Sequence, residues 1–559
     1  MHIGYNEAEK FFGLLYDKPK GIFYESDFAI NRNSGDYTND GLIYYTIEMD
    51  DIKNTQVFRR MSKIFQLGTK YLENSNLMHS RAKHSKGTYA RTMELCMHIL
   101  EDNNIRGIVK KYGYEKYIVA ELMRGFMHDI GHGPFSHTME TICNLPKGFH
   151  EDIGKRMINE NEELKAKLNA VWPNLPEIME EVEQRNFLGL NSLFEGQIDV
   201  DRGDFLPRDS MALRLDDSNS DEITELLQKV EIKKVIIEGK GKLVPVYPYE
   251  CLEKIEKFLE ARFNNYQKYY EAPKAKVYDH VYKEFSEELL RSEEEHSLKT
   301  FLRNNYEKMP EEIDLDEYIS YNDIEFLKGI IEVYDNTEDE KLKSLARICI
   351  PDEESYYPLY YGLMVTNEDV NEFGNLGRLS PENDRFFRRI GEIPPGSTQE
   401  LIQERYITQK CRNEKDLKYK LKEIKKELGE EGKFTPENYG ISYYVSKNSL
   451  YKDKKGEEIF IEDEDGKIYT FDKHPKRRVP LKTFTNVVVI VDKEKLKEKT
   501  KNKEELKDKE LLNIIIEEYP EYSKCILEYP KNLEGKTISD IKYKNYTQNY
   551  ERAKNLYIE

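Results

Sequence analysis

The sequence lacks long apolar runs and paired cysteines. It contains no stretch of about 18 consecutive apolar residues, and its first residues have no uninterrupted apolar core of the kind that a signal peptide needs. The six cysteines are widely separated and form no CxxC pair, so the sequence indicates neither a disulfide framework nor a zinc knuckle. These absences argue against a membrane or secreted protein, and we expect a soluble, intracellular protein of the cytoplasm.

An excess of positive charge is also lacking. Lysine and arginine number 86 against 105 aspartate and glutamate residues, which gives a formal net charge of -19. Binding to a nucleic-acid backbone requires clustered positive charge, so the composition argues against a nucleic-acid partner while leaving room for a local basic pocket. Tryptophan occurs once, but aromatic residues make up 12% of the 559 residues, which is typical of a folded chain.

Hydrophobic periodicity divides the chain into helical and mixed parts. Residues 1–50 show no sustained helical period and are predicted to be irregular or short-stranded, whereas helical spacing recurs from Thr55 to about residue 230. Two short strands are expected in EIKKVIIEGKGKLVPVYPYE, followed by a helix from Cys251 to about Tyr270. After residue 412 a Lys/Glu-rich helix precedes alternating and β-branched stretches such as TNVVVIV. We predict a mainly α-helical fold with a smaller α+β C-terminal subdomain, divided into an N-terminal segment (1–50), a core (51–290), a helical extension of the core (291–412) and an α+β regulatory or oligomerisation subdomain (413–559).

Histidines gather in one part of the sequence, since seven of eleven lie between positions 79 and 150. His128 and Asp129 begin the segment HDIGHGPFSH, in which His132 would lie one helical turn later on the same face. His128 and Asp129, together with His84 and Asp201, form a mixed set of nitrogen and oxygen ligands. Such a set suits Mn, Fe, Ni or Zn better than Ca, while Mg would enter with substrate phosphates. A metal at such a site lowers the pKa of a bound water and holds a phosphate. Each histidine alone is more simply a buried structural residue, so the metal-site interpretation rests on the combination.

Five fragments carry a resemblance to one family. FQLG (65–68), RAKHSKG (81–87), HDIGHGPFSH (128–137), FHE (149–151) and IDVDRGDFLPRD (198–209) resemble the motifs of the HD-domain deoxynucleoside triphosphate triphosphohydrolases. The pattern is most similar to the branch whose members also carry a sterile-alpha-motif domain, and we expect no such domain here. The resemblance implies an HD-domain core that hydrolyses a deoxynucleoside triphosphate (dNTP) to a deoxynucleoside and inorganic triphosphate.

The resemblance also implies a role for each motif residue. The implied metal ligands are His84, His128, Asp129 and Asp201. The implied catalytic residues are His132, His137, His150 and Glu151, with His137 as the proton donor to the departing deoxyribose oxygen and Glu151 orienting the imidazoles. The implied substrate-binding residues are Arg81, Arg202 and Arg262 for the triphosphate, Gln66 and Asp209 for the 3′-hydroxyl, Leu67 beside them, Tyr270 under the sugar ring, and Phe205 near the phosphates.

Several positions depart from the family's pattern. Arg202 stands where members commonly have lysine, and Phe205 stands where a tyrosine offers a hydroxyl to the phosphates, so we expect an altered rate or substrate preference. Asn54 and Ser62 replace an aspartate and an arginine of guanine-regulated members, which argues against control by GTP or dGTP in that form. Because the family's regulatory sites lie between subunits, the resemblance implies a homo-oligomer, with a tetramer favoured, and an activating nucleotide.

Two other functions fit part of the sequence. An HD-domain phosphodiesterase or nucleotidase, acting on a cyclic nucleotide, a monophosphate or a guanosine alarmone, would keep the metal ligands without needing Gln66, Asp209 and Tyr270. A non-hydrolysing nucleotide sensor would have no need for a proton donor such as His137. The biological role stays open between control of the dNTP pool and depletion of dNTPs as a defence against viruses or phages.

Overall fold

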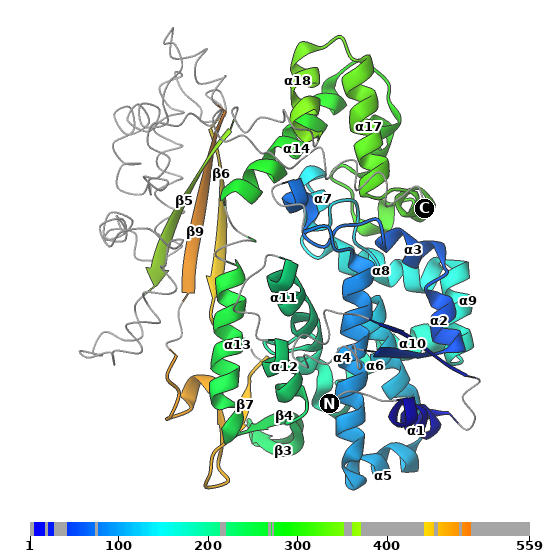
Figure 1. Cartoon of the computed structure of the whole chain (residues 1–559), viewed down its shortest axis with the longest axis vertical. Helices are drawn as coiled ribbons and strands as arrows, with labels where there is room; N and C mark the ends of the chain where they lie inside the picture. The colour runs from blue at the N-terminus through cyan, green and yellow to red at the C-terminus, as the bar shows by residue number, and fades with distance from the viewer. Residues whose placement is uncertain are drawn as a thin grey trace. The chain divides into compact units, whose positions relative to one another are not determined.

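Helices make up most of the described chain, as predicted (Figure 1). None of the described helices has the length and apolarity that a membrane span requires. The chain divides into two compact units, one formed by Met1–Arg262, Glu293–Gly329 and Lys452–Arg477, the other by Phe263–Ser292, Ile330–Tyr451 and Arg478–Glu559. The computed structural model describes residues 5–16, 21–26, 42–72, 77–212, 220–266, 270, 273–350, 360–369, 441–451, 457–479 and 483–492.

The first unit is built around one long buried helix, α4 (Arg81–Glu101), which packs against α6 (Glu115–Met127) and α11 (Val200–Ala212). Ser80 caps α4 by accepting a hydrogen bond from the Lys83 amide, which fixes where this helix begins. The other helices of this unit are α1 (Tyr5–Leu15), α2 (Ile47–Ile52), α3 (Gln56–Met61), α5 (Asn103–Tyr112), α7 (His137–Ile142), α8 (Phe149–Glu160), α9 (Glu162–Val171), α10 (Leu175–Arg185), α12 (Ser220–Leu227), α15 (Ser297–Asn305), α16 (Leu315–Ser320) and the greater part of α13 (Leu252–Asn265). Short 3-10 turns lie at Gly68–Leu72, Phe187–Leu193, Tyr249–Cys251, Pro310–Glu312 and Phe471–Lys473.

The described residues of the first unit also form two small sheets. Strands β1 (Ile22–Ser26) and β2 (Leu42–Thr46) pair antiparallel. The predicted strand pair is confirmed as β3 (Glu231–Ile237) and β4 (Lys240–Pro248), joined by a two-residue turn at Glu238 and Gly239 whose φ angles of 52° and 76° suit a tight hairpin. β4 then pairs in parallel with β7 (Phe460–Glu462), and β7 pairs antiparallel with β8 (Ile468–Thr470).

The second unit combines helices with a three-stranded sheet. The helix α14 (Pro273–Arg291) packs against α18 (Glu340–Cys349), where the Tyr282 hydroxyl donates to the Cys349 carbonyl at 2.8 Å, and α17 (Asp323–Asn336) continues from the first unit. In the sheet the strand containing TNVVVIV, β9 (Thr483–Asp492), lies between β5 (Tyr360–Asp369) and β6 (Ile441–Ser449) and pairs antiparallel with both. A run of β-branched residues suits this central position.

Two features differ from the sequence-based picture. Tyr5–Leu15 is a helix that buries Phe11, Phe12 and Leu15, although no helical period was apparent in residues 1–50. The late strands are divided between the units, because β7 and β8 pair with β4 whereas β6 and β9 pair with β5. The predicted α+β character of the C-terminal part is present, and Lys452–Arg477 is grouped with the first unit, while the bounds 413–559 stay a prediction. The Lys/Glu-rich helix predicted after residue 412 lies outside the described residues.

Candidate active site

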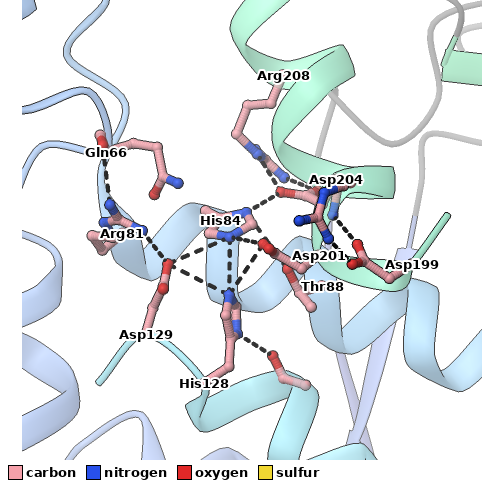
Figure 2. Close-up of polar contacts among 12 residues, drawn as sticks. Gln66, Arg81, His84, Thr88, His128, Asp129, Asp199, Asp201, Asp204 and Arg208 are labelled. Carbon is pink, nitrogen blue, oxygen red and sulfur yellow. Dashed lines mark hydrogen bonds and ion pairs between the residues drawn. The ribbon is translucent and has the colours of Figure 1, made fainter. Parts of the chain in front are cut away.

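Three elements bring the predicted metal ligands together. His84 lies in the first turn of α4, Asp201 lies in the first turn of α11, and His128 and Asp129 directly follow the last residue of α6 (Figure 2). Because α4 packs against both α6 and α11, the four side chains meet. We call these four residues the metal cluster.

The spacing of the metal cluster fits a divalent ion. His84 Nε2 lies 3.0 Å from His128 Nε2, 2.9 Å from Asp201 Oδ1 and 3.4 Å from Asp129 Oδ2. His128 Nε2 lies 3.5 Å from Asp129 Oδ2 and 3.4 Å from Asp201 Oδ1. Ligand atoms placed at ~2.1 Å around a tetrahedral or octahedral ion are about 3.0–3.4 Å from their neighbours. The ligand atoms of His84, His128 and Asp201 all lie within 4.8 Å of one another, and Asp129 Oδ2 lies within 3.5 Å of both imidazoles, so the spacing suits ligands of a shared metal ion.

The charges of the metal cluster also favour a bound cation. Burial acts to lower the pKa of His84, but hydrogen bonds to Asp201 and Asp204 and the charge of Asp129 outweigh it and raise the pKa to about 10. The carboxylates also raise the pKa of His128 above its usual value, although burial opposes them. The carboxylates thus favour a positive charge between the two imidazoles, and a divalent cation meets the same demand.

The segment from His128 to Ser136 is a series of turns, which corrects the prediction that it continues as a helix. α6 ends at Met127, and Gly131, Gly133 and Pro134 disfavour helix beyond it. The His132 amide still bonds to the Asp129 carbonyl at 3.1 Å, so these two residues lie one turn apart as expected. Gly131 is required by close packing, because a Cβ there would lie 2.0 Å from the His150 carbonyl oxygen.

A second group of titratable side chains lies beside the metal cluster. We call His132, His137, Glu140 and His150 the histidine cluster; their ligand-type atoms lie within 4.8 Å of one another. The rings of His132 and His150 stack with centroids 4.0 Å apart, and His137 packs edge-on against both. His132 Nε2 lies 3.3 Å from Asp129 Oδ1, so Asp129 belongs to the metal cluster and also contacts the histidine cluster.

Glu140 is the carboxylate within this histidine cluster, and it was not among the residues predicted from the sequence. It bonds to His150 Nδ1 and lies 3.8 Å from His137 Nδ1, while the predicted partner Glu151 is exposed on α8. Burial alone would raise the pKa of Glu140, but hydrogen bonds from His137 and His150 lower it to about 2. The i,i+3 spacing of His137 and Glu140 was the available signal in the sequence.

A buried carboxylate far along the chain supports two of these segments. Asp323 Oδ2 accepts from the Phe65 amide at 2.9 Å, and Asp323 Oδ1 accepts from the Phe135 amide at 2.6 Å. Phe135 and Ser136 have φ angles of 57°, which non-glycine residues rarely adopt, and they directly precede His137. No sequence motif pointed to Asp323.

The predicted substrate-binding residues of the first unit make contacts with the protein itself. Arg202 pairs with Asp199 and donates to the Gly196 carbonyl at 2.5 Å. Asp209 Oδ1 lies 2.6 Å from His79 Nε2, and the His79 carbonyl accepts from the Gln66 amide at 2.9 Å, so His79 links two predicted sugar contacts. Arg262 donates to the Gln197 carbonyl at 3.2 Å, and the Phe205 ring packs edge-on against His84 with ring centroids 6.1 Å apart. Leu67 is buried. Tyr270 belongs to the second unit, where its ring packs against that of Tyr266.

Comparisons with known proteins agree with this site. Residues 81–206, which include all four residues of the metal cluster, match the model of the HD domain family. The chain is 35% identical over 162 residues to the uncharacterized protein YwfO of Bacillus subtilis, which covers 29% of this chain and 35% of that protein. It is 24% identical over 254 residues to the deoxynucleoside triphosphate triphosphohydrolase SAMHD1 homolog of Dictyostelium discoideum, which covers 38% of this chain and 46% of that protein. The chain thus spans less than half of the length of each of these relatives.

A solved structure shares the fold. The crystal structure of a phosphohydrolase from Bacteroides thetaiotaomicron superimposes with a TM-score of 0.56 and 18% sequence identity, over 84% of this chain and 100% of that one. At this identity the likeness concerns the fold. Together with the family match, the metal cluster shows that the chain carries an HD domain, a domain typical of metal-dependent phosphohydrolases.

Proposed function

We propose that the protein is a metal-dependent hydrolase that cleaves a dNTP at its α-phosphorus and releases a deoxynucleoside and inorganic triphosphate. The position of Arg81 carries the proposal. Its guanidinium donates to Asp129 of the metal cluster at 2.5 Å and to the hydroxyl of Ser136, directly before His137, at 2.9 Å. It also donates to the Gln66 carbonyl at 3.3 Å. One side chain therefore contacts a predicted metal ligand, the residue before the predicted proton donor, and the backbone of a predicted sugar-binding residue.

The metal cluster supplies the first part of the chemistry. A divalent ion held there would lower the pKa of a water and neutralise phosphate charge. His84, His128, Asp129 and Asp201 would bind it, and Arg81 beside Asp129 adds a guanidinium, whose shape matches phosphate oxygens. With a divalent ion bound, the site would offer positive charge to the phosphates of a triphosphate.

The histidine cluster supplies the proton. His137 is 66% exposed to solvent, whereas His132 is buried, so His137 has the open face that a substrate can reach. The negative charge of a bound triphosphate favours the protonated form of His137, and the protonated ring can then donate to the departing deoxyribose oxygen. Glu140 orients His137 from its Nδ1 side.

Unsatisfied polar atoms support a sugar site. Gln66 Oε1 and His79 Nδ1 are buried and have no hydrogen-bond partner among the described residues. Gln66 and His79 are joined by a backbone hydrogen bond, and His79 contacts Asp209. Buried polar atoms without partners are rare, and a ligand hydroxyl would satisfy them. The steric exclusion of a 2′-hydroxyl by Tyr270 is part of the proposal through the resemblance.

The assembly and regulation are proposed on similarity. The Dictyostelium relative is named a deoxynucleoside triphosphate triphosphohydrolase, and the motif resemblance extends to a family regulated between subunits. We include in the proposal a homo-oligomer, with a tetramer favoured, and an activating nucleotide. The cellular role would be control of the dNTP pool or depletion of dNTPs against viruses or phages.

The test is a product analysis. The purified protein is incubated with Mn²⁺ or Mg²⁺ and each of the four dNTPs, singly and mixed, and the products are resolved by ion-exchange chromatography. We expect deoxynucleoside and intact inorganic triphosphate, and activity only in mixtures would identify an activating nucleotide. Asp201→Ala should lose metal and turnover together, because it removes one of the four ligands.

A matched control separates the site from general damage. Glu160 forms an i,i+4 ion pair with Arg156 on α8, away from both clusters, and Glu160→Gln should leave turnover unchanged. Cleavage of cyclic nucleotides or monophosphates without cleavage of any dNTP would establish the phosphodiesterase or nucleotidase instead. Nucleotide binding without any product would establish the sensor.

A further inference from the structure

The imidazole ring of His84 is held by a hydrogen bond at the nitrogen that faces away from the metal cluster. Its Nε2 faces the other ligands, whereas its Nδ1 lies 2.8 Å from Asp204 Oδ2, with a longer contact of 3.5 Å to the Thr88 hydroxyl (Figure 2). Asp204 in turn accepts two hydrogen bonds from Arg208, at 2.9 Å from Nε and 2.7 Å from Nη2. His84, Asp204 and Arg208 are 1%, 4% and 4% exposed, so water does not compete for these contacts.

The helix α11 contacts both nitrogens of this one ring. Asp201 and Asp204 lie three residues apart and therefore on the same face of α11. Asp201 Oδ1 lies 2.9 Å from Nε2 of His84, and Asp204 lies at Nδ1 on the opposite side of the ring. Because it approaches the other nitrogen, Asp204 orients His84 and is not itself a ligand of the same ion.

Gly87 makes this approach possible. It lies three residues after His84 on α4, where a Cβ would lie 1.8 Å from Asp204 Oδ1 and 2.4 Å from Arg208 Nη2. Glycine in a helix interior is destabilising relative to alanine, so its presence here needs a packing reason. The contact with the carboxylate of Asp204 provides that reason.

The second imidazole of the metal cluster is oriented differently. His128 Nδ1 lies 3.0 Å from the carbonyl oxygen of Gly125, within its own chain segment. Both rings therefore have Nδ1 occupied and Nε2 directed at the shared site. A carboxylate increases the basicity of an imidazole ligand, so the contact of His84 with Asp204 strengthens this ligand.

We propose that Gly87, Asp204 and Arg208 form a positioning unit that fixes the ring orientation of His84 and retains its proton on Nδ1, and that this unit sets the affinity of the site for its metal. The inference rests on the metal cluster of the proposed function and is independent of the dNTP substrate. Asp204 is a positioning residue, Arg208 holds Asp204, and Gly87 provides the space.

The test measures Mn²⁺ alone, without nucleotide. Free Mn²⁺ is followed by its electron paramagnetic resonance signal during a titration of the metal-free protein, with circular dichroism to verify folding. Asp204→Ala is expected to weaken Mn²⁺ binding by ~10–100-fold, as is usual for loss of a carboxylate that orients a histidine ligand. Asp204→Asn is expected to have a smaller effect, because the amide oxygen still accepts from Nδ1. Glu160→Gln, which removes a carboxylate from another i,i+4 arginine pair, is the control and should bind Mn²⁺ as the wild type does.

The glycine gives a sharper test through non-additivity. Gly87→Ala should weaken Mn²⁺ binding in the wild-type protein, because the new methyl group displaces Asp204. In the Asp204→Ala background the same substitution should have no further effect, since the carboxylate is gone and the end of the Arg208 side chain can move. Gly107→Ala is the matched control, because Gly107 also lies in a helix but a Cβ there meets no atom within 4 Å.

The outcomes separate the inference from the proposed function. Wild-type Mn²⁺ affinity in folded Asp204→Ala, or additive effects of Gly87→Ala and Asp204→Ala, would overturn the inference even if dNTPs are cleaved. Weakened Mn²⁺ binding in Asp204→Ala supports the inference even if the wild-type protein cleaves no dNTP. If Asp204→Ala does not fold, Asp204→Asn and Gly87→Ala are compared with the wild type in the same titration, and unchanged affinity in both overturns the inference.

Discussion

Asp323→Asn is expected to slow turnover while leaving the metal bound. Asp323 is fully buried, and its two oxygens accept from the amides of Phe65 and Phe135. Phe65 precedes Gln66 in the predicted sugar site, and Phe135 lies two residues before His137, the proposed proton donor. Asp323 makes no contact with the metal cluster among the contacts of the described residues, so the substitution perturbs the two neighbouring segments selectively.

The magnitude follows from the two hydrogen bonds. The amide of asparagine keeps one acceptor and turns an N–H₂ group toward the other backbone N–H, which leaves a buried donor without a partner. Loss of a hydrogen bond to a charged group amounts to about 1.5–3 kcal/mol, and an unsatisfied buried group adds to this. Burial raises the pKa of Asp323 to about 7, so the wild-type charge is itself unfavourable and offsets part of the loss. We expect a net decrease in the free energy of unfolding of roughly 2–4 kcal/mol.

The effect on turnover follows from the strained turn. Phe135 and Ser136 have φ angles of 57°, and the bond from Phe135 to Asp323 helps to maintain them. When this bond is lost the turn can relax and shift His137, and a displacement of about 1 Å lowers a rate on the order of 100-fold. We therefore expect kcat to fall by roughly 10- to 100-fold with little change in bound metal.

The assay combines four readings. Steady-state kinetics give kcat, elemental analysis gives the metal content, urea unfolding gives the stability, and amide hydrogen exchange reports on the segments around Phe65 and Phe135. Asp314→Asn is the control, because Asp314 also accepts from two backbone amides but is exposed at the start of α16. A wild-type kcat in Asp323→Asn, or a loss of metal that matches the loss of turnover, would refute the reasoning.

Three further outcomes are expected. His137→Ala should retain its metal while the chemical step slows by about 10²–10⁴-fold in single-turnover experiments, and a parallel loss of metal would contradict its role as proton donor. Glu121 is buried beside Arg124, and burial raises the pKa of Glu121 from 4.5 to about 7. Between pH 4.5 and about 7 the folded state therefore binds more protons than the unfolded state. The wild type should therefore lose stability relative to Glu121→Gln as the pH rises from about 4.5 to 7, by at most about 3 kcal/mol, and urea titrations that show a constant difference would exclude this. Tyr270→Ala should relax discrimination against ribonucleotides, and unchanged ratios of kcat/KM would remove the proposed steric gate.

The fold class was predictable because its signals are local. Helical spacing and the β-branched run of β9 follow from residues close in sequence, and the predicted mainly helical fold with small late sheets is confirmed. The helix α1 was missed because its buried face is only three turns long and its exposed face is mixed. The division of the late strands between two units was not predictable either, since pairing of β7 with β4 depends on contacts across more than 200 residues.

The candidate site was also predictable only in part. The structure brings together His84, His128, Asp129 and Asp201, whose residue types and motifs made them conspicuous in the sequence. The residues that position them were not conspicuous, because an aspartate that accepts hydrogen bonds resembles any other aspartate. Asp323 lies 188 residues from Phe135, and its importance arises from burial and from two backbone amides that no motif records.

The geometry of Arg81 explains why arginine suits this position. A guanidinium has five N–H donors, and three nitrogens of Arg81 already donate to Ser136, Asp129 and the Gln66 carbonyl. Each of the two terminal nitrogens carries a second N–H, so Arg81 can bind a phosphate oxygen without releasing Asp129 or Gln66. The same side chain can therefore orient a predicted metal ligand and also offer N–H donors to a phosphate of the proposed substrate. The ammonium group of a lysine is one point with three donors and has no planar fork, so it could not join these three separated acceptors and a phosphate.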